Sequence, residues 1–341
     1  MTLRFLKTSL LGTLGLVAVA ALVASSPLAL GAARNAASTQ RTAKTGVVVV
    51  STTLAYGGSA AGTGIVLTSS GAVLTNNHVV RGAKSVRVTD TSTGRTYRAV
   101  VVGYSVPKDI ALLQLRNASG LSTALLGTSS NLRVGDRVTA VGNAGGTGSL
   151  TTKSGRLVRL GRTITVTDED GSSTRLTGLI ETSAVLEPGD SGGPLLRQGR
   201  VIGIDAAAAS SFRFTSGGEG YAIPIDSALT IVGKIETGRA SATVHIGPTA
   251  FLGVALAPEG YAQDVSGALV EGVSQGSPAH AAGIGADDVI TSFAGKPVRS
   301  AAALKRLVLR FAPGRVVRVT WLDRFTGKNV ATVRLASGPP Q

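Results

Sequence analysis

Short runs of β-branched and other apolar residues alternate with turns rich in Gly, Ser and Asn from residue 46 to about residue 224. Many short strands separated by turns are typical of β-sandwiches and β-barrels. The runs fall into two groups of about six, so we predict a mainly β fold with two six-stranded barrels. The first group is residues 47–50, 64–68, 72–75, 86–89, 97–103 and 110–115, and the second is residues 137–141, 154–160, 163–166, 176–181, 201–205 and 221–223.

A helix and a smaller α+β unit are expected after the barrels. One apolar helix face is formed by Ala228, Ile231, Val232 and Ile235. Asp226 or Ser227 is expected to cap this helix and Gly238 to end it. In the smaller unit we expect helices after Ser277 and near Ser300, and strands at residues 251–256, 268–273, 316–322 and 329–335.

The N-terminus predicts export. Arg4 and Lys7 precede an uncharged stretch, residues 8–33, whose centre is almost wholly apolar. This pattern is typical of a secretory signal peptide, but the run is also long enough for an uncleaved membrane anchor. Both alternatives place the remaining chain outside the cytoplasm. We divide the chain into the leader (1–33), a linker (34–45), the barrels with their helix (46–238), a second linker (239–248) and the small domain (249–337).

Composition limits the chemistry that is available. The chain has no cysteine, so disulfides, cysteine metal sites and a cysteine nucleophile are excluded, and we expect no metal or cofactor. The net charge is +15, but the basic residues form no single tract and aromatic residues are 4% of the chain. Stacking platforms are therefore scarce, which argues against nucleic acid as a partner. A solvated basic surface is the simplest interpretation, and association with anionic lipid or cell-wall polymer is the alternative.

The sequence Gly189-Asp190-Ser191-Gly192-Gly193-Pro194 is the sharpest chemical signal. Its glycines permit a tight turn that would expose the serine hydroxyl. The same turn could aim the N–H groups of Gly189 and Ser191 at a substrate carbonyl oxygen as an oxyanion hole. A serine hydroxyl is a weak nucleophile, however, and requires a base.

His78 is the candidate base, because His245 and His280 lie outside the predicted barrels. Asp109 precedes an apolar run and could hold the imidazole in one orientation. Each residue alone has an ordinary alternative as a structural histidine, a turn aspartate or a loop serine. The catalytic interpretation depends on the three occurring together, in this order.

These motifs resemble the HtrA/Deg family of PDZ-containing, chymotrypsin-like serine proteases. The resemblance covers roughly residues 46–336 and is carried by the segments 62–64 (GTG), 75–79 (TNNHV), 109–112 (DIAL), 189–195 (GDSGGPL) and 220–224 (GYAIP). It implies a protease domain over residues 46–238 and a PDZ domain over residues 249–337. It also implies Ser191 as nucleophile, His78 as general base, Asp109 as its orienting partner, and Gly189 with Ser191 as the oxyanion hole.

The resemblance places a specificity pocket at Val185, Ala206, Ala207, Ala208 and Gly220. These residues are small or apolar, so we predict cleavage after small or medium aliphatic residues. A peptide library cut mainly after arginine would refute this prediction. The direction of the Asp205 side chain is left open.

In the PDZ domain the resemblance assigns Phe251, Leu252 and Gly253 to a loop that binds a peptide carboxylate. Val254, Leu304 and Leu307 would line the adjoining side-chain pocket, although a core role for the two leucines is an equal alternative. The expected ligands are peptide C-termini, bound as an added strand.

Asp190 departs from the family pattern, because many members carry asparagine before the serine. In digestive enzymes of this fold, an aspartate here pairs with a new N-terminus created by cleavage, but no activation site is evident in this sequence. We predict that Asp190 pairs with an internal arginine or with backbone N–H groups and helps to order the turn. The alternative is an exposed loop carboxylate.

The function implied is a serine endopeptidase that degrades unfolded or damaged exported proteins. Two alternatives remain: a non-enzymatic PDZ adaptor or chaperone on a protease scaffold, and a cell-surface binding protein that uses its basic charge. The N-terminal apolar stretch also allows membrane association, and the resemblance allows a homo-oligomer, such as a trimer.

Overall fold

The computed structural model describes residues 43–55, 57–167, 173–206, 220–258, 266–323 and 327–341. These residues belong to one compact unit, Gln40–Gln341. The predicted leader, residues 1–33, lies outside the described residues, as does most of the first linker. Within the described ranges, no helix combines the length and apolar character that a membrane span requires.

The first barrel closes in the strand order β5-β4-β1-β2-β3-β6, because β5 also pairs with β6. All of its pairings are antiparallel, and Val50, Val73 and Leu113 are fully buried inside it. The strands are β1 (Val47–Leu54), β2 (Ser59–Val66), β3 (Ala72–Thr75), β4 (Ala83–Asp90), β5 (Arg95–Ser105) and β6 (Ile110–Leu115). A short strand from the second predicted linker, β13 (His245–Ile246), extends this sheet by pairing with β5.

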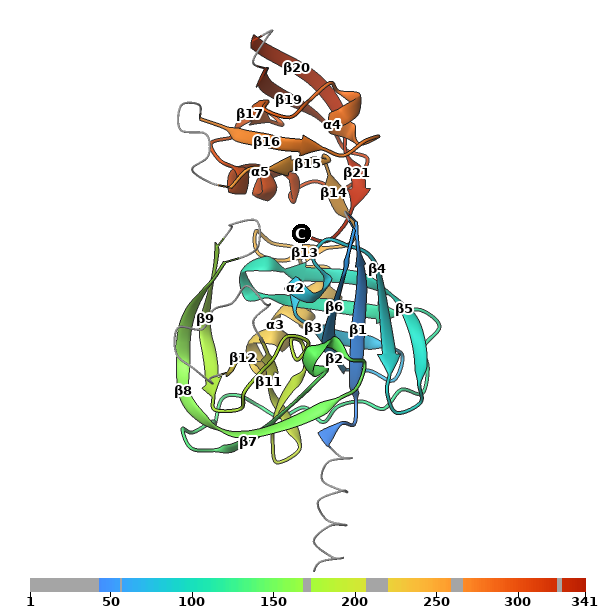
Figure 1. The fold of residues 1–341 in the computed structure, drawn as a ribbon, viewed down its shortest axis with the longest axis vertical. Helices are drawn as coiled ribbons and strands as arrows, with labels where there is room; N and C mark the ends of the chain where they lie inside the picture. Colours follow the sequence, from blue (N-terminus) through green and yellow to red (C-terminus); the bar gives the residue numbers. More distant parts are fainter. Residues whose placement is uncertain (1–42, 56, 168–172, 207–219, 259–265, 324–326) are drawn as a thin grey trace, which may run out of the picture. The chain divides into compact units, whose positions relative to one another are not determined.

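The second barrel closes in the order β10-β11-β12-β9-β8-β7. Leu157, Ile180 and Leu195 lie in its core. Its strands are β7 (Arg137–Gly142), β8 (Thr151–Thr167), β9 (Ser173–Thr182), β10 (Pro194–Arg197), β11 (Arg200–Asp205) and β12 (Gly220–Pro224). Figure 1 shows the two barrels, and their six-stranded closure confirms the predicted fold class.

Two strand predictions in the second barrel were wrong. Residues 154–160 and 163–166 belong to the single strand β8, because Gly161 (φ +74°) occupies a bulge between them and not a turn. The sequence analysis also missed β10, which begins at Pro194 immediately after the glycine-rich motif. Proline is tolerated at the first residue of a strand, so it does not exclude one here.

Helix α3 (Ile225–Glu236) presents the predicted apolar face to a core shared by both barrels. Its predicted end at Gly238 is confirmed, since Gly238 has φ +69° and donates to the carbonyl of Ile235. The predicted cap was wrong: Pro224 occupies the N-cap position without a side-chain hydrogen bond. Asp226 instead accepts hydrogen bonds from Thr128 and Ser129.

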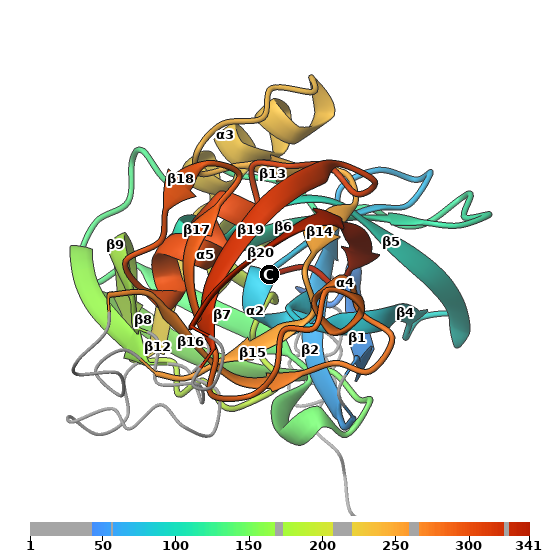
Figure 2. The ribbon, with the colours of Figure 1, turned by 90° about the horizontal axis from the view of Figure 1, so that it is seen from above.

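The small domain is a sheet in the order β15-β16-β17-β19-β20, with β18 paired to β17 (Figures 1 and 2). Helix α5 packs on this sheet through Leu304. Ser277 and Ser300 cap α4 and α5 by accepting from the amides of His280 and Ala303, as expected for N-cap serines. The elements are β14 (Thr249–Phe251), β15 (Val254–Leu256), β16 (Ala268–Val273), α4 (Pro278–Ala281), β17 (Val289–Phe293), β18 (Lys296–Pro297), α5 (Ala301–Val308), β19 (Val316–Asp323), β20 (Gly327–Arg334) and β21 (Ala336–Gly338).

The predicted strand over residues 251–256 is interrupted. Gly253 has φ +91°, so β14 ends at Phe251 and β15 begins at Val254. Before the break β14 pairs with β21, and after it β15 joins the main sheet. The interruption leaves β15 as an edge strand.

Candidate active site

His78 lies on a one-turn helix, α2 (Asn77–Val80), that follows β3. The side chains of Val79 and Val80 are buried and fix the helix against the first barrel. Asp109 binds the histidine at two points: Oδ2 lies 2.7 Å from His78 Nδ1, and Oδ1 accepts from the His78 backbone amide at 2.9 Å. Because a carboxylate oxygen accepts, Nδ1–H is the donor in this hydrogen bond, which fixes the orientation of the imidazole ring.

Asp109 reaches His78 from the end of a 3-10 helix, η1 (Val106–Lys108), just before β6. Its backbone is left-handed, with φ 51° and ψ 45°, a conformation that aspartate tolerates better than most residues. The side-chain amide of Asn76 donates to the Asp109 carbonyl at 2.9 Å. The segment before His78 therefore also holds the backbone of Asp109.

The turn around Ser191 requires glycine at two positions. Gly189 (φ +98°) and Gly192 (φ +85°) both have left-handed backbones. A Cβ atom on Gly189 would overlap the Asn143 carbonyl oxygen, and one on Gly192 would overlap the Thr63 carbonyl oxygen. The close packing of this turn on its surroundings explains the glycine-rich motif.

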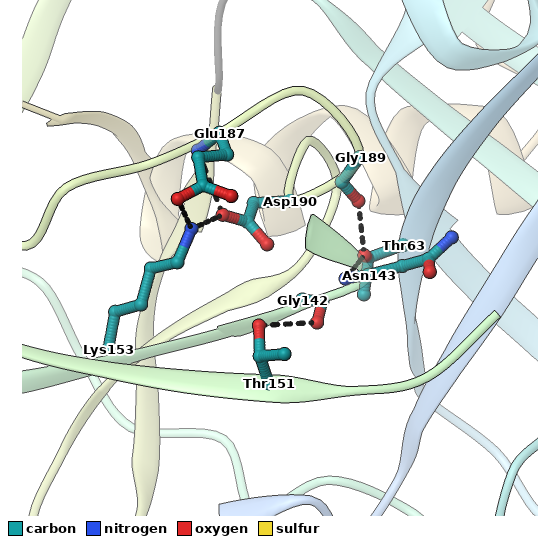
Figure 3. Close-up of polar contacts among 8 residues, drawn as sticks. All are labelled: Thr63, Gly142, Asn143, Thr151, Lys153, Glu187, Gly189 and Asp190. Atoms are coloured by element: carbon teal, nitrogen blue, oxygen red, sulfur yellow. Dashed lines mark hydrogen bonds and ion pairs between the residues drawn. The ribbon is translucent and has the colours of Figure 1, made fainter. Parts of the chain in front are cut away.

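Thr63, on β2 of the first barrel, holds this turn of the second barrel. Its amide donates to the Ser191 carbonyl at 2.8 Å. Its hydroxyl donates to the Gly189 carbonyl at 2.7 Å and accepts from the Asn143 amide at 2.9 Å (Figure 3). Thr63 is fully buried. Sequence analysis used it only as part of a motif, because nothing local indicates a contact between residues 126 positions apart.

The orientation of the Gly189 amide follows from its neighbour Pro188. The Pro188 carbonyl accepts from Gly145 N at 2.8 Å, in the loop that contains η2 (Ala144–Gly146). In a trans peptide the N–H points opposite to the preceding carbonyl. The Gly189 N–H therefore points away from Gly145.

Gly62 lies where the histidine helix and the serine turn meet. A Cβ atom there would lie 2.7 Å from a methyl group of Val79 on α2 and 3.1 Å from the Ser191 carbonyl oxygen. The structure thus brings His78, Asp109 and Ser191 to one seam between the barrels. Ser191 is 4% exposed, and the His78 side chain is 29% exposed.

Asp190 points into the second barrel and is 1% exposed. Its Oδ2 accepts from Lys153 Nζ at 2.8 Å and from the Glu187 amide at 2.9 Å (Figure 3). The predicted backbone contact is confirmed, but the predicted arginine is wrong because the cation is a lysine. The exposed-carboxylate alternative is also wrong. Lys153 lies 37 residues earlier in the chain, and no sequence pattern connects it with Asp190.

The residues assigned to the specificity pocket fall into two groups. Val185 is 51% exposed, whereas Ala206 and Gly220 are buried; Ala207 and Ala208 lie outside the described residues. Gly220 is close to residues 184–186, since a Cβ atom there would lie 2.6 Å from the Ala184 carbonyl oxygen and from the side chain of Leu186. The structure therefore places residue 220 beside the segment that contains Val185.

Asp205 is fully buried, so its side chain does not line an open pocket. Burial raises the pKa of Asp205 well above its usual range, and the nearby Asp190 carboxylate raises it further, although Lys153 opposes both effects. Within the described residues, neither carboxyl oxygen of Asp205 has a hydrogen-bond partner. This environment favours the neutral acid.

In the small domain, the assigned loop precedes the edge strand β15. Leu252 is buried, Phe251 and Val254 are half-buried, and Gly253 has a left-handed backbone against the side chain of Ser277. Leu307 is half-buried, whereas Leu304 is 1% exposed and lies in the core.

The fold and the site define a trypsin-like peptidase followed by a PDZ domain. The model of the trypsin-like peptidase domain matches residues 62–204, and that of the PDZ domain matches residues 250–333. The chain is 36% identical to serine protease PepD of Mycobacterium tuberculosis over 291 residues, or 80% of this chain and 60% of PepD. It is 36% identical to the putative serine protease HhoA of Synechocystis over 287 residues, or 80% of this chain and 71% of HhoA.

A third relative is the periplasmic pH-dependent serine endoprotease DegQ of Escherichia coli, 36% identical over 76% of this chain and 55% of DegQ. Among solved structures, the HtrA-type protease AlgW with a decapeptide has a TM-score of 0.51 and 26% identity, covering 89% of this chain and 99% of that chain. The chain belongs to the HtrA family of PDZ-containing, trypsin-like serine proteases.

Proposed function

We propose that the protein is a serine endopeptidase that cleaves unfolded or damaged proteins outside the cytoplasm. The observation that carries this proposal is the pair of hydrogen bonds between the Asp109 carboxylate and His78, at the seam where Thr63 also holds Ser191. An oriented imidazole beside a serine on a glycine turn is the arrangement that acyl transfer requires. The relatives named serine proteases support the same activity.

In the proposed reaction, His78 Nε2 takes the proton of the Ser191 hydroxyl as the oxygen attacks the peptide carbonyl carbon. Asp109 stays ionised and stabilises the imidazolium through Nδ1–H. The carbonyl oxygen becomes negative and is held by the amides of Gly189 and Ser191. The proton then passes from His78 to the leaving amine, and water activated by the same imidazole hydrolyses the acyl-enzyme.

We further propose that the PDZ domain captures peptide C-termini along β15. Because β15 lies at the edge of the sheet, one side of this strand is open for an added peptide. The adjoining loop that contains Gly253 can offer backbone N–H groups to a carboxylate. Because Leu304 lies in the core, Val254 and Leu307 are the better candidates for the side-chain pocket.

The location and assembly belong to the same proposal. The periplasmic relative DegQ and the predicted leader support action outside the cytoplasm. Membrane attachment, a trimer and preference for aliphatic residues before the cleaved bond stay predictions.

A fluorophosphonate probe tests the proposed activity directly. We expect wild-type protein to be labelled, with the adduct on Ser191, and to cleave casein. Ser191→Ala should lose both, because the Ser191 hydroxyl is the nucleophile in the proposed reaction. Equal results for the two proteins would reject the protease and favour the adaptor.

A further inference from the structure

The residue before the nucleophile carries a charge that the fold has buried. Asp190 is 1% exposed, and its carboxylate has lost the water that would otherwise stabilise it. Among the described residues, Lys153 is the only cationic side chain within ion-pair distance of this carboxylate. The Nζ–Oδ2 distance of 2.8 Å is that of a charge-assisted hydrogen bond.

Lys153 is held by the second barrel itself. It lies on β8, where it pairs with Ala140 of β7, and its side chain is 20% exposed. Its Nζ also lies 3.3 Å from Glu187 Oε1, but the Glu187 side chain is 54% exposed (Figure 3). Exposed ion pairs contribute little because solvent screens them, so the buried Asp190 is the partner that depends on the ammonium.

Backbone hydrogen bonds join Asp190 to both ends of the serine turn. Its amide donates to the Glu187 carbonyl at 3.0 Å, and its carbonyl accepts from the Gly193 amide at 2.9 Å. A shift of Asp190 would therefore move the two peptide units that flank it, Gly189–Asp190 and Asp190–Ser191. The Ser191 N–H lies in the second of these units, and the Gly189 N–H lies in the peptide unit that precedes the first.

The geometry points to Lys153 as a positioning residue, whose ammonium holds Asp190 beneath Ser191 and keeps the oxyanion-hole amides of Gly189 and Ser191 aligned. This inference rests on the proposed function, because it assigns a role within the same catalytic turn. Since the cation is a side chain of the same barrel, no cleavage of the chain is needed to supply it.

Asp205 supports this assignment. Its amide donates to the Gly193 carbonyl at 2.7 Å, and its carbonyl accepts from the Gly192 amide at 2.8 Å, so it underlies the same turn. Burial, and then the Asp190 carboxylate, raise the pKa of Asp205 well above its usual range. A neutral Asp205 does not compete with the Asp190 carboxylate for the positive charge of Lys153.

Four variants test the inference: Lys153→Met, Lys153→Arg, Asp190→Asn and the double variant Lys153→Met/Asp190→Asn. The measurements are the rate of fluorophosphonate labelling at Ser191, and kcat and KM for a peptide substrate. Lys153→Met should lower labelling and kcat at least about 100-fold, the loss expected when an oxyanion donor is misplaced. KM should change little, and Lys153→Arg should keep most of the activity.

The double variant separates positioning from a general structural role. Asparagine at position 190 carries no charge and does not need the ammonium, so Lys153→Met should change labelling less than about threefold in that background. Arg197→Gln is the control: it breaks an ion pair of similar length (2.7 Å) to the more exposed Asp136, elsewhere in the same barrel. We expect it to label like the wild type.

A Lys153→Met variant that labels within threefold of the wild type overturns the inference, and so does an equal loss in both backgrounds. If Lys153→Met does not fold, the double variant decides: normal labelling supports the inference, and failure to fold or to be labelled contradicts it. Wild-type protein that is not labelled would reject the proposed function, and this inference with it. Labelled wild type with an unaffected Lys153→Met rejects the inference alone.

Discussion

One hydroxyl group connects three separate segments of the site. Thr63 Oγ1 lies between the Gly189 carbonyl and the Asn143 amide, and all three groups are buried or nearly so. The hydroxyl acts as donor to one and acceptor from the other, which neither a carbonyl nor an amide could do. The threonine side chain thus fixes the serine turn relative to the first barrel.

Thr63→Val should weaken both stability and catalysis. Valine keeps the shape but leaves a buried N–H and a buried carbonyl unpaired, at about 1–3 kcal/mol each. We expect the free energy of unfolding to fall by about 2 kcal/mol or more, and kcat to fall more than KM rises. Urea unfolding and peptide kinetics measure the two effects.

Thr63→Ser is the matched control because it retains the hydroxyl, and it should behave nearly as wild type. Thr89→Val provides a second control, since Thr89 is only half-buried and its hydroxyl pairs with the hydroxyl of Thr96 in a solvent-exposed hydrogen bond. A Thr63→Val protein with unchanged stability and kcat would show that the hydroxyl does not hold the turn.

At the level of elements, the histidine helix packs on β2 at Gly62, which contributes no side chain to the contact. Gly62 has an ordinary backbone, so glycine is needed there for space and not for conformation. Its missing side chain lets α2 and the serine turn approach each other. Gly62 is therefore a spacing residue between the base and the nucleophile.

Gly62→Ala should push α2 away from Ser191. The added methyl group would lie 2.7 Å from Val79, and overpacking of this kind destabilises by about 1–3 kcal/mol. A small misplacement of a catalytic group can lower the rate about 100-fold, so we expect kcat/KM to fall at least about tenfold.

The double variant Gly62→Ala/Val79→Ala should recover part of the loss, because it removes the methyl groups that the new side chain meets. Comparison of kcat/KM for the wild type, both single variants and the double variant gives the coupling. Additive losses would mean that α2 is not displaced through Val79.

The elements also show where sequence reasoning succeeds and where it ends. Apolar runs predicted most strands, because each strand buries a local stretch of the chain. Residues 154–160 and 163–166 were predicted as two strands, because glycine at position 161 suits a bulge as well as a turn; only the pairing with β9 distinguishes the two. The strand β10 was hidden behind the glycine motif, and its identity depends on pairing with β7 and β11.

For the whole molecule, the site exists only when both barrels have formed and docked. His78 and Asp109 come from the first barrel, whereas Ser191 and its turn come from the second. Motif order was enough to name these residues, since each motif is local. It could not reveal Thr63, Gly145 or Lys153, whose roles arise from contacts across or between barrels.

Burial of Asp205 also affects the stability of the whole fold. Its pKa is raised in the native state, so the native state keeps its proton while the unfolded chain releases it above about pH 4. The proton-linked stabilisation is fully present below the unfolded pKa and is lost as pH rises to and through the native one. Within that window the loss is about 1.4 kcal/mol per pH unit.

Asp205→Asn should remove this dependence, because the amide resembles the neutral acid and does not ionise. We expect the variant to unfold at a higher temperature than the wild type at pH 7 but not at pH 4.

Asp226→Asn is the opposite case. Burial tends to raise the pKa of Asp226, but hydrogen bonds from Thr128 and Ser129 outweigh it and lower the pKa. Asp226→Asn should therefore be destabilised at pH 7, with a deficit that shrinks as pH falls toward 3. Calorimetry from pH 3 to 8 compares the proteins, and a pH-independent difference between Asp205→Asn and wild type would contradict a protonated Asp205.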